Sequence, residues 1–170
     1  LQYPADLFMK WSVSEKEAIG IYEVVFDDSN KKDKKWYINT NQSFAFADDT
    51  VTASYGTATP KAHADTTWTQ EDLDDLDEVG DLTAGDIKTR GLKYNLIKDL
   101  KVNVSNELAR TDWYITRNAE KSTAIPSSIS THRDAVRTKQ ASMEIAITNA
   151  SNTPALETLY TYTTTDGVQS

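Results

Sequence analysis

Apolar residues recur along this chain with two different periods, and the change between them divides the chain. In the first third, short runs rich in β-branched and aromatic residues alternate with polar turns, a pattern typical of strands. Strands are expected at 21–26, 36–38, 43–46 and 51–55, with the charged run 27–35 as a loop and Asp48-Asp49 as a tight turn. The pattern predicts a small antiparallel β-meander.

Two short helices are expected ahead of these strands. Residues 4–11 can form one helical turn. Ser14 and Glu17 then have the spacing of a capping box, in which each side chain satisfies the other's backbone N–H. Gly20 is expected to end this second helix.

The second half of the chain has helical periodicity. A helix is expected over 88–110, with an apolar stripe formed by Leu96, Ile97, Leu100, Val104 and Leu108. A second helix is expected after Pro126, because proline biases the residue before it away from helical geometry. Its apolar face comprises Ile129, His132, Val136, Met143 and Ile147. A third, short helix is expected from Thr153-Pro154, with the face Leu156, Leu159 and Tyr160.

Between the two longer helices, the sequence favours a short extended run that carries Trp113. In an extended run Trp113 and Ile115 would point to one side and Tyr114 and Thr116 to the other. Trp113 is interpreted as a core residue between two antiparallel helices, with an interface anchor as the alternative. The predicted core of this helical module comprises Leu100, Val104, Leu108, Trp113, Ile129 and Val136.

The predicted fold class is α+β, in three parts. Residues 1–56 form a β-rich attachment or interface domain, 57–86 an acidic linker, and 87–170 the helical module. Residues 62–87 contain no Lys or Arg, and acids crowd 71–81. Such a run is typical of a solvated loop or short helix, or of a patch for a basic partner. An EF-hand is excluded, because its fifth and sixth positions, counted from Asp72, are Leu76 and Asp77.

Composition and charge exclude several kinds of partner and site. The formal charge of −8 argues against nucleic-acid binding, and the absence of cysteine excludes disulfides and thiolate metal sites. No apolar run is long enough to span a membrane. The chain begins at Leu1 rather than Met, so it is expected to be the ordered part of a longer polypeptide.

The search for catalytic motifs indicates that the chain is not an enzyme and needs no metal or cofactor. His132-Arg133-Asp134 has the first three letters of a kinase catalytic loop, but Lys139 stands where that loop needs asparagine. No nucleophile elbow supports a Ser-His-Asp triad. His132 is interpreted as a packed, hydrogen-bonded ring rather than a base.

The aromatic residues of the first third are more than one small sheet can cover. They are the candidates for an interface with another chain: Trp11, Tyr22, Phe26, Trp36, Phe44 and Phe46.

Five short segments carry a resemblance to a known family. They are Arg90-Gly91-Leu92-Lys93, Leu108-Ala109-Arg110-Thr111-Asp112-Trp113, Ile125-Pro126, Arg133-Asp134-Ala135-Val136-Arg137 and Leu156-Glu157-Thr158-Leu159. In order and spacing they resemble the C-terminal module of small tailed-bacteriophage proteins, which are tail-fibre assembly chaperones and related tail-associated virion proteins. In that family an aromatic residue commonly precedes the R-x-A-V-R segment, and here His132 holds that place.

The resemblance implies a structural virion protein, a tail subunit or adaptor that works by protein–protein binding. Its implied partners are other tail or neck proteins and copies of itself, and its implied location is the virion tail after synthesis in the host cytoplasm. The alternative is a tail-fibre assembly chaperone that is absent from the mature virion. A tail-borne hydrolase is a distant third.

Overall fold

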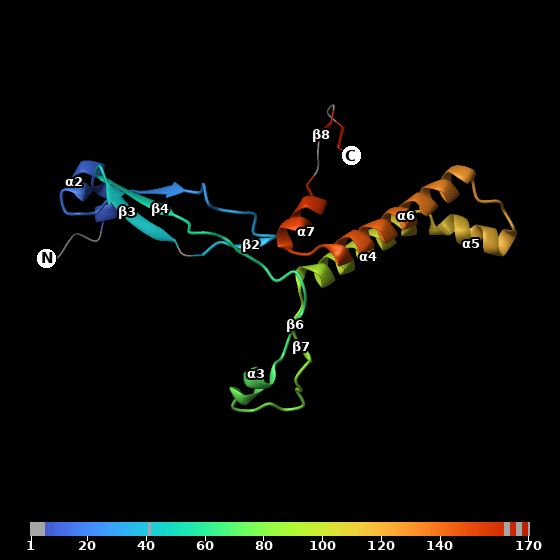
Figure 1. Cartoon of the computed structure of the whole chain (residues 1–170). Helices are drawn as coiled ribbons and strands as arrows, with labels where there is room; N and C mark the ends of the chain where they lie inside the picture. The colour runs from blue at the N-terminus through green and yellow to red at the C-terminus, as the bar shows by residue number, and fades with distance from the viewer. Residues whose placement is uncertain (1–5, 41, 162–163, 166–167, 170) are drawn as a thin grey trace. The chain divides into compact units, whose positions relative to one another are not determined.

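The computed structural model describes residues 6–40, 42–161, 164–165 and 168–169 (Figure 1). It confirms the α+β class, with short strands in the first part and long helices in the second. The chain divides into two compact units, Leu1–Pro60 and Lys61–Ser170. Each unit is described by itself.

The first unit begins with two short helices, α1 (Leu7–Lys10) and α2 (Val13–Glu17). A capping box opens α2, but Ser12 and Glu15 form it rather than Ser14 and Glu17. Both pairs have the same spacing, and the structure uses the earlier one. Gly20 follows in the left-handed region at φ 82°, as expected of a residue that ends a helix. Pro4, expected at the start of the first helix, lies outside the described residues.

A three-stranded sheet of order β1-β4-β3 forms the body of this unit. Strands β3 (Ser43–Ala47) and β4 (Thr50–Ser54) form the expected hairpin, and its turn residues Asp48 and Asp49 have positive φ. Strand β1 (Val24–Asp27), however, pairs with β4 in parallel. The prediction of a simple antiparallel meander is therefore wrong, because periodicity predicts where strands lie but not which strands pair.

Strand β2 (Tyr37–Ile38) does not join this sheet, and pairs instead with β5 (Thr59–Pro60). The loop before β2 is held by Asn39, whose side chain accepts from the Lys32 amide at 2.9 Å and donates to the Lys32 carbonyl at 2.7 Å. Trp36 is 3% exposed. Its side chain is therefore buried within this chain, and its prediction as an interface aromatic is wrong.

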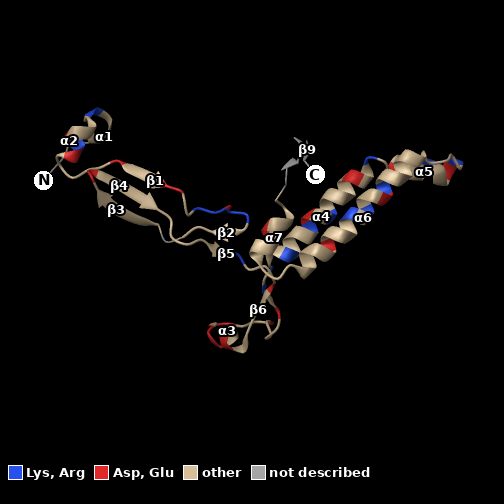
Figure 2. Ribbon diagram, turned by 45° about the horizontal axis from the view of Figure 1, so that its top comes forward, with Lys and Arg blue, Asp and Glu red and all other residues tan. Residues whose placement is uncertain are grey.

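The acidic segment expected to be a linker is folded. Strands β6 (Thr66–Thr67) and β7 (Ile87–Thr89) pair in antiparallel fashion, and the short helix α3 (Gln70–Asp74) lies between them in the chain. A capping box of Thr69 and Asp72 opens α3, and Leu73 is buried. We call residues 66–89 the acidic lobe; Figure 2 shows red acidic residues around α3.

The second unit is built mainly from four helices: α4 (Leu92–Ala109), α5 (Asp112–Lys121), α6 (Ser127–Asn149) and α7 (Thr153–Leu159). Helices α4 and α6 lie side by side and run in opposite directions (Figures 1 and 2). The expected helix starts after Pro126 and at Thr153 are confirmed. Two further short strands, β8 (Thr164–Thr165) and β9 (Val168–Gln169), pair with each other.

Helix α4 begins at Leu92 rather than Lys88, which belongs to β7. Gly91 precedes the helix, and a Cβ at this position would lie 2.3 Å from the Ala64 backbone. This close approach lets the Leu92 amide donate to the Ala62 carbonyl at 3.0 Å. The position therefore requires glycine, and the contact satisfies a donor that a helix start leaves open.

The fully buried residues of the helical unit lie far along the chain from Trp113. Leu96, Ile147, Thr153 and Leu156 are buried, and the Thr153 hydroxyl donates to the Lys61 carbonyl at 2.6 Å. Trp113 is 51% exposed and lies in α5, so the predictions of an extended run and of a core tryptophan are both wrong. The other predicted core residues are half-buried: Leu100, Val104, Leu108, Ile129 and Val136.

Candidate protein-binding surfaces

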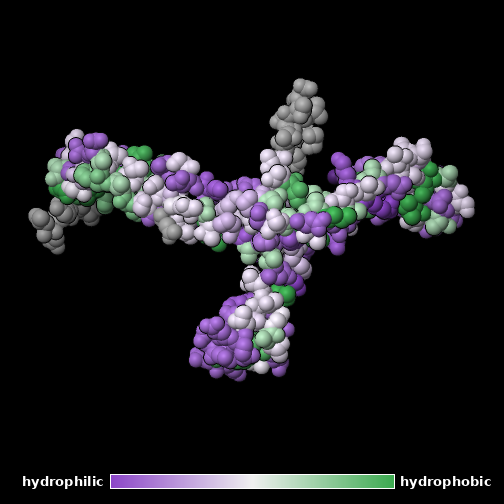
Figure 3. Space-filling model, viewed as in Figure 1, coloured by the Kyte–Doolittle hydropathy of each residue, from purple (hydrophilic) through white to green (hydrophobic). Residues whose placement is uncertain are grey.

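One face of the three-stranded sheet is apolar. Because residues paired across neighbouring strands share a face, the register puts Val24, Val51 and Phe46 in one row. Phe26, Ala53 and Phe44 form the next row on the same side. We call these six residues the sheet face. Figure 3 shows green and pale green atoms over the part of the first unit that carries this sheet.

The large side chains of the sheet face are exposed. Phe26 is 66%, Phe44 64% and Phe46 56% exposed, whereas Ala53 between Phe26 and Phe44 is buried. The Tyr22 ring lies 4.5 Å from the Phe46 ring, centroid to centroid, which covers part of one edge of this face. Three exposed phenylalanines on one small sheet make an apolar patch of the kind that marks a binding surface.

The opposite side of the sheet is mostly polar. It carries Thr50, Thr52 and Ser54 of β4, and the hydroxyl of Ser54 lies 3.3 Å from that of Ser43. Val25 is its one large apolar residue among the three strands. The contrast between the sides means that a partner recognising apolar surface would bind the sheet face.

Helix α5 of the helical unit carries two exposed apolar side chains. Trp113 and Ile115 are both exposed there. The Trp113 ring lies 3.9 Å from the Tyr114 ring between centroids, and the Arg117 guanidinium lies 5.6 Å from the Trp113 ring centre. Trp, Tyr and Arg are the residue types that dominate binding energy at interfaces, so α5 presents a candidate anchor.

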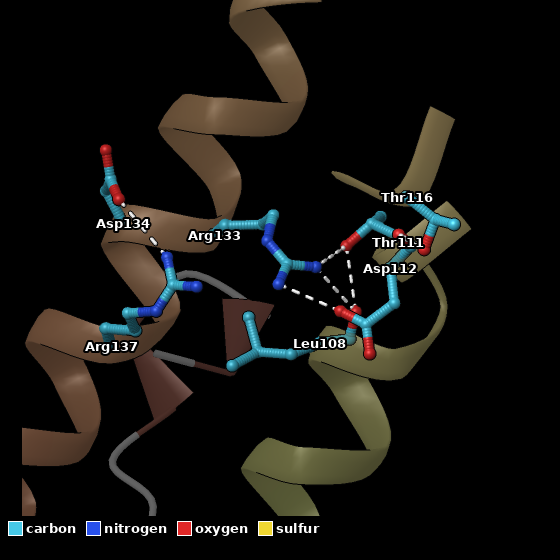
Figure 4. A network of polar contacts seen from close by, with 7 residues as sticks. All are labelled: Leu108, Thr111, Asp112, Thr116, Arg133, Asp134 and Arg137. Atoms are coloured by element: carbon cyan, nitrogen blue, oxygen red, sulfur yellow. Dashed lines mark hydrogen bonds and ion pairs between the residues drawn. The ribbon is translucent and has the colours of Figure 1, made fainter. Parts of the chain in front are cut away.

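A buried arginine fixes the position of α5. Arg133 of α6 donates from Nη1 to the Leu108 carbonyl at 2.7 Å and to the Thr111 hydroxyl at 2.6 Å (Figure 4). Its Nη2 lies 2.9 Å from Oδ1 of Asp112. These contacts join α6 to the end of α4 and to the first residue of α5. The orientation of Trp113, next to Asp112, therefore depends on Arg133.

Sequence reasoning assigned this place on α6 to the neighbouring His132. The hydrogen bond expected of His132 is confirmed, because its Nε2 lies 3.1 Å from Oε1 of Glu107, but the ring is exposed, so its prediction as packed on the apolar face is wrong. The spacing does not separate the two residues, because His132 lies three residues after Ile129 and four before Val136, and Arg133 lies four after and three before. Arg133 was not predicted to be buried, because an arginine is seldom buried without paired groups.

The remaining interface candidates of the first unit, Trp11 and Tyr22, are half-buried. Their part in an interface stays a prediction. Residues Phe26, Phe44 and Phe46 share one face, which the sequence alone did not establish.

Two carboxylates hold this part of the chain together, Asp72 inside the acidic lobe and Asp65 just before it. The Lys88 ammonium and then the Thr69 backbone and hydroxyl groups lower the pKa of Asp72 from 3.8 to about 2. Asp65 accepts from the Gly91 amide and the Arg90 guanidinium, both at 2.7 Å, and these contacts lower its pKa. While ionised, Asp72 thus ties α3 to Lys88 of β7, and Asp65, just before β6, binds Arg90 and Gly91 just after β7.

Within the described part of the chain, no group of three or more His, Asp or Glu side chains could hold a metal ion. Among the helices described, none has both the length and the apolar character to cross a membrane. No protein-family model, curated protein or solved structure matches this chain.

Replacing Arg133 with methionine tests its role in holding α5. We expect the substitution to lower the free energy of unfolding by about 1–3 kcal/mol, because the Leu108 carbonyl and the Thr111 hydroxyl lose a buried donor. The ion pair itself adds little, since Asp112 is 60% exposed. Amide exchange in α5 should accelerate more than exchange in α7.

Arg137→Met is the matched control, because Arg137 lies one turn further along α6 and is exposed. Its expected effect is below about 0.5 kcal/mol. Equal destabilisation by the two substitutions would contradict the assigned role of Arg133.

Acid should loosen the acidic lobe before the rest of the second unit. Because the folded-state pKa of Asp72 is depressed to about 2, its stabilising contribution is present above the ordinary value and is lost as the pH falls toward the folded value. We expect the α3 amides to lose exchange protection between pH 4 and pH 2, at about these two pKa values. Asp72→Asn should remove this pH dependence, whereas Asp75→Asn should retain it. Constant α3 protection in the wild-type chain down to the lower pH would be incompatible with this account.

Proposed function

We propose that this chain is a structural protein of a tailed bacteriophage, a tail-associated subunit or adaptor that acts by binding other proteins and not by catalysis. The observation that supports a binding role most directly is the exposed sheet face, with Phe26, Phe44 and Phe46 on one side of a small sheet. The phage-tail context rests on the resemblance of the segments between Arg90 and Leu159.

The physical argument is the free energy available at the sheet face. Full burial of a phenylalanine side chain stabilises by about 1.5–3 kcal/mol relative to exposure. Three half-exposed phenylalanines can therefore supply a substantial part of a specific interface. The polar opposite side cannot, so the partner would be another tail or neck protein with an apolar surface that covers the sheet face.

The alternative is a tail-fibre assembly chaperone, which would use the same apolar surface but leave before the particle is complete. The two functions differ in whether the chain remains bound to the finished particle. A subunit is present in purified particles at a fixed number of copies, and a chaperone is not.

Quantitative mass spectrometry of purified phage particles tests the proposal. We expect the wild-type chain to be present at fixed stoichiometry, and Phe26→Ser/Phe44→Ser to reduce its incorporation by about tenfold or more, because central aromatic residues carry most interface energy. Val25→Ser is the matched control, since Val25 lies on the same strand as Phe26 but on the opposite side. It should incorporate normally.

Two results would count against the proposal. Absence of the wild-type chain from particles would support the chaperone. Normal incorporation of the double phenylalanine variant would show that the sheet face is not the attachment surface.

A further inference from the structure

Strand β3 lies at the edge of the three-stranded sheet. All five of its residues are exposed. An edge strand presents backbone N–H and C=O groups that another strand can bind. Which groups are presented, and which strand they suit, follows from the hairpin geometry.

The two-residue turn fixes the hydrogen-bonding pattern of β3. In such a turn the flanking residues, here Ala47 and Thr50, form a hydrogen-bonded pair. Hydrogen-bonded and non-hydrogen-bonded pairs then alternate along the hairpin. Ser43, Ala45 and Ala47 therefore bond to β4, and the backbone groups of Phe44 and Phe46 point toward the free edge.

This edge has no charge, proline or bulge of the kind that usually prevents pairing. The strand reads Ser-Phe-Ala-Phe-Ala, with no charge and no proline, and its register with β4 runs without a bulge. The other edge strand, β1, contains Asp27 and is preceded by Glu23. Charged residues at an edge disfavour pairing, so of these two strands β3 is the one suited to bind a further strand.

We infer that β3 pairs with β3 of a second copy of this chain, in antiparallel orientation, about a two-fold axis at Ala45. In this register Phe44 of each copy lies opposite Phe46 of the other, and their outward backbone groups exchange four hydrogen bonds. The two sheets become one sheet of six strands. The two sheet faces become continuous, with two aromatic pairs across the new junction.

Charge selects the orientation of this pairing. The chain carries a net charge of −8, so two copies repel each other, and this repulsion is weaker where the segments that meet, residues 42–47, carry no charge. Parallel pairing would place Asp48 and Asp49 beside their counterparts. Antiparallel pairing centred on Ala45 places Asp48 opposite the neutral Gln42, which avoids the repulsion of like charges directly opposite each other.

The strength of this contact follows from its size. A pairing of five-residue strands buries less than the roughly 1,200 Å² of a standard interface, so we expect a dissociation constant in the micromolar range. Half of the chains are then dimeric only when the protein concentration reaches about the dissociation constant. The dimer becomes more populated when a particle holds two copies close together, because this raises their effective concentration. The inference rests on the proposed binding role of the first unit, but it uses the strand edge, together with only Phe44 and Phe46 of the sheet face.

Ala45 offers a direct test, because its side chain is exposed and meets itself across the axis. Sedimentation of the full-length wild-type chain up to about 500 μM should show a monomer–dimer equilibrium with a micromolar dissociation constant. Ala45→Lys and Ala45→Glu should each be monomeric, because like charges would lie directly opposite. An equimolar mixture of these two variants should restore the dimer. Ala47→Lys, which faces Ser43 of the other copy, should dimerise as the wild type does.

A second measurement does not depend on how the charged variants fold. The chain has no cysteine, so Ala45→Cys introduces a single thiol at a non-hydrogen-bonded pair, where Cα atoms lie about 4.5 Å apart. Mild oxidation should link two copies of this variant rapidly. Ala47→Cys should link at least about tenfold more slowly, because its thiols lie on opposite sides of the axis and too far apart for a disulfide.

Each of these measurements has an outcome that would rule out the dimer. A wild-type chain that stays monomeric, a dimer that survives Ala45→Lys, or equal cross-linking by the two cysteine variants would overturn the inference. None of these results changes the incorporation expected for Phe26→Ser/Phe44→Ser, so failure of the dimer and failure of the proposed attachment surface are distinguishable.

Discussion

The arrangement of the first unit depends on a sheet that has one apolar side and too few residues to cover it. A three-stranded sheet becomes stable when its apolar face packs against another layer. Here α1 and α2 together provide nine helical residues, and Phe26, Phe44 and Phe46 remain exposed. The unit therefore buries Ala53 at the centre of this face and leaves the aromatic side chains of the sheet face accessible.

In the helical unit, a charged residue holds the short helix α5 in place. A short helix such as α5 has little surface with which to hold its place, and its apolar residues Trp113 and Ile115 face outward. Arg133 replaces apolar packing with directed contacts to Leu108, Thr111 and Asp112. A buried guanidinium is costly to desolvate, so its use at this corner favours a defined orientation of α5 over maximum stability.

The sequence predicted the elements better than it predicted their partners. Helix starts at Pro126 and Thr153 were predictable because proline has a local effect on the backbone. The parallel pairing of β1 with β4 was not, because strand periodicity does not specify which strands pair. Trp113 was misassigned because its run of β-branched and aromatic neighbours favours a strand, whereas the contacts of Asp112 with Arg133 hold the segment at a helix start. Among the candidate interface aromatics, Phe26, Phe44 and Phe46 share one face, which only the strand register shows. Trp36 is buried, which only its exposed fraction shows.

The central claim is that another protein covers the sheet face when this chain is assembled. Hydroxyl-radical footprinting of the free chain and of purified particles measures this residue by residue, with Tyr94 on α4 as a reference outside the first unit. The account predicts that oxidation of Phe26 and Phe44 falls by about fivefold or more on assembly, because the core of an interface excludes water. Equal oxidation of both phenylalanines in the free chain and in the particle would contradict it.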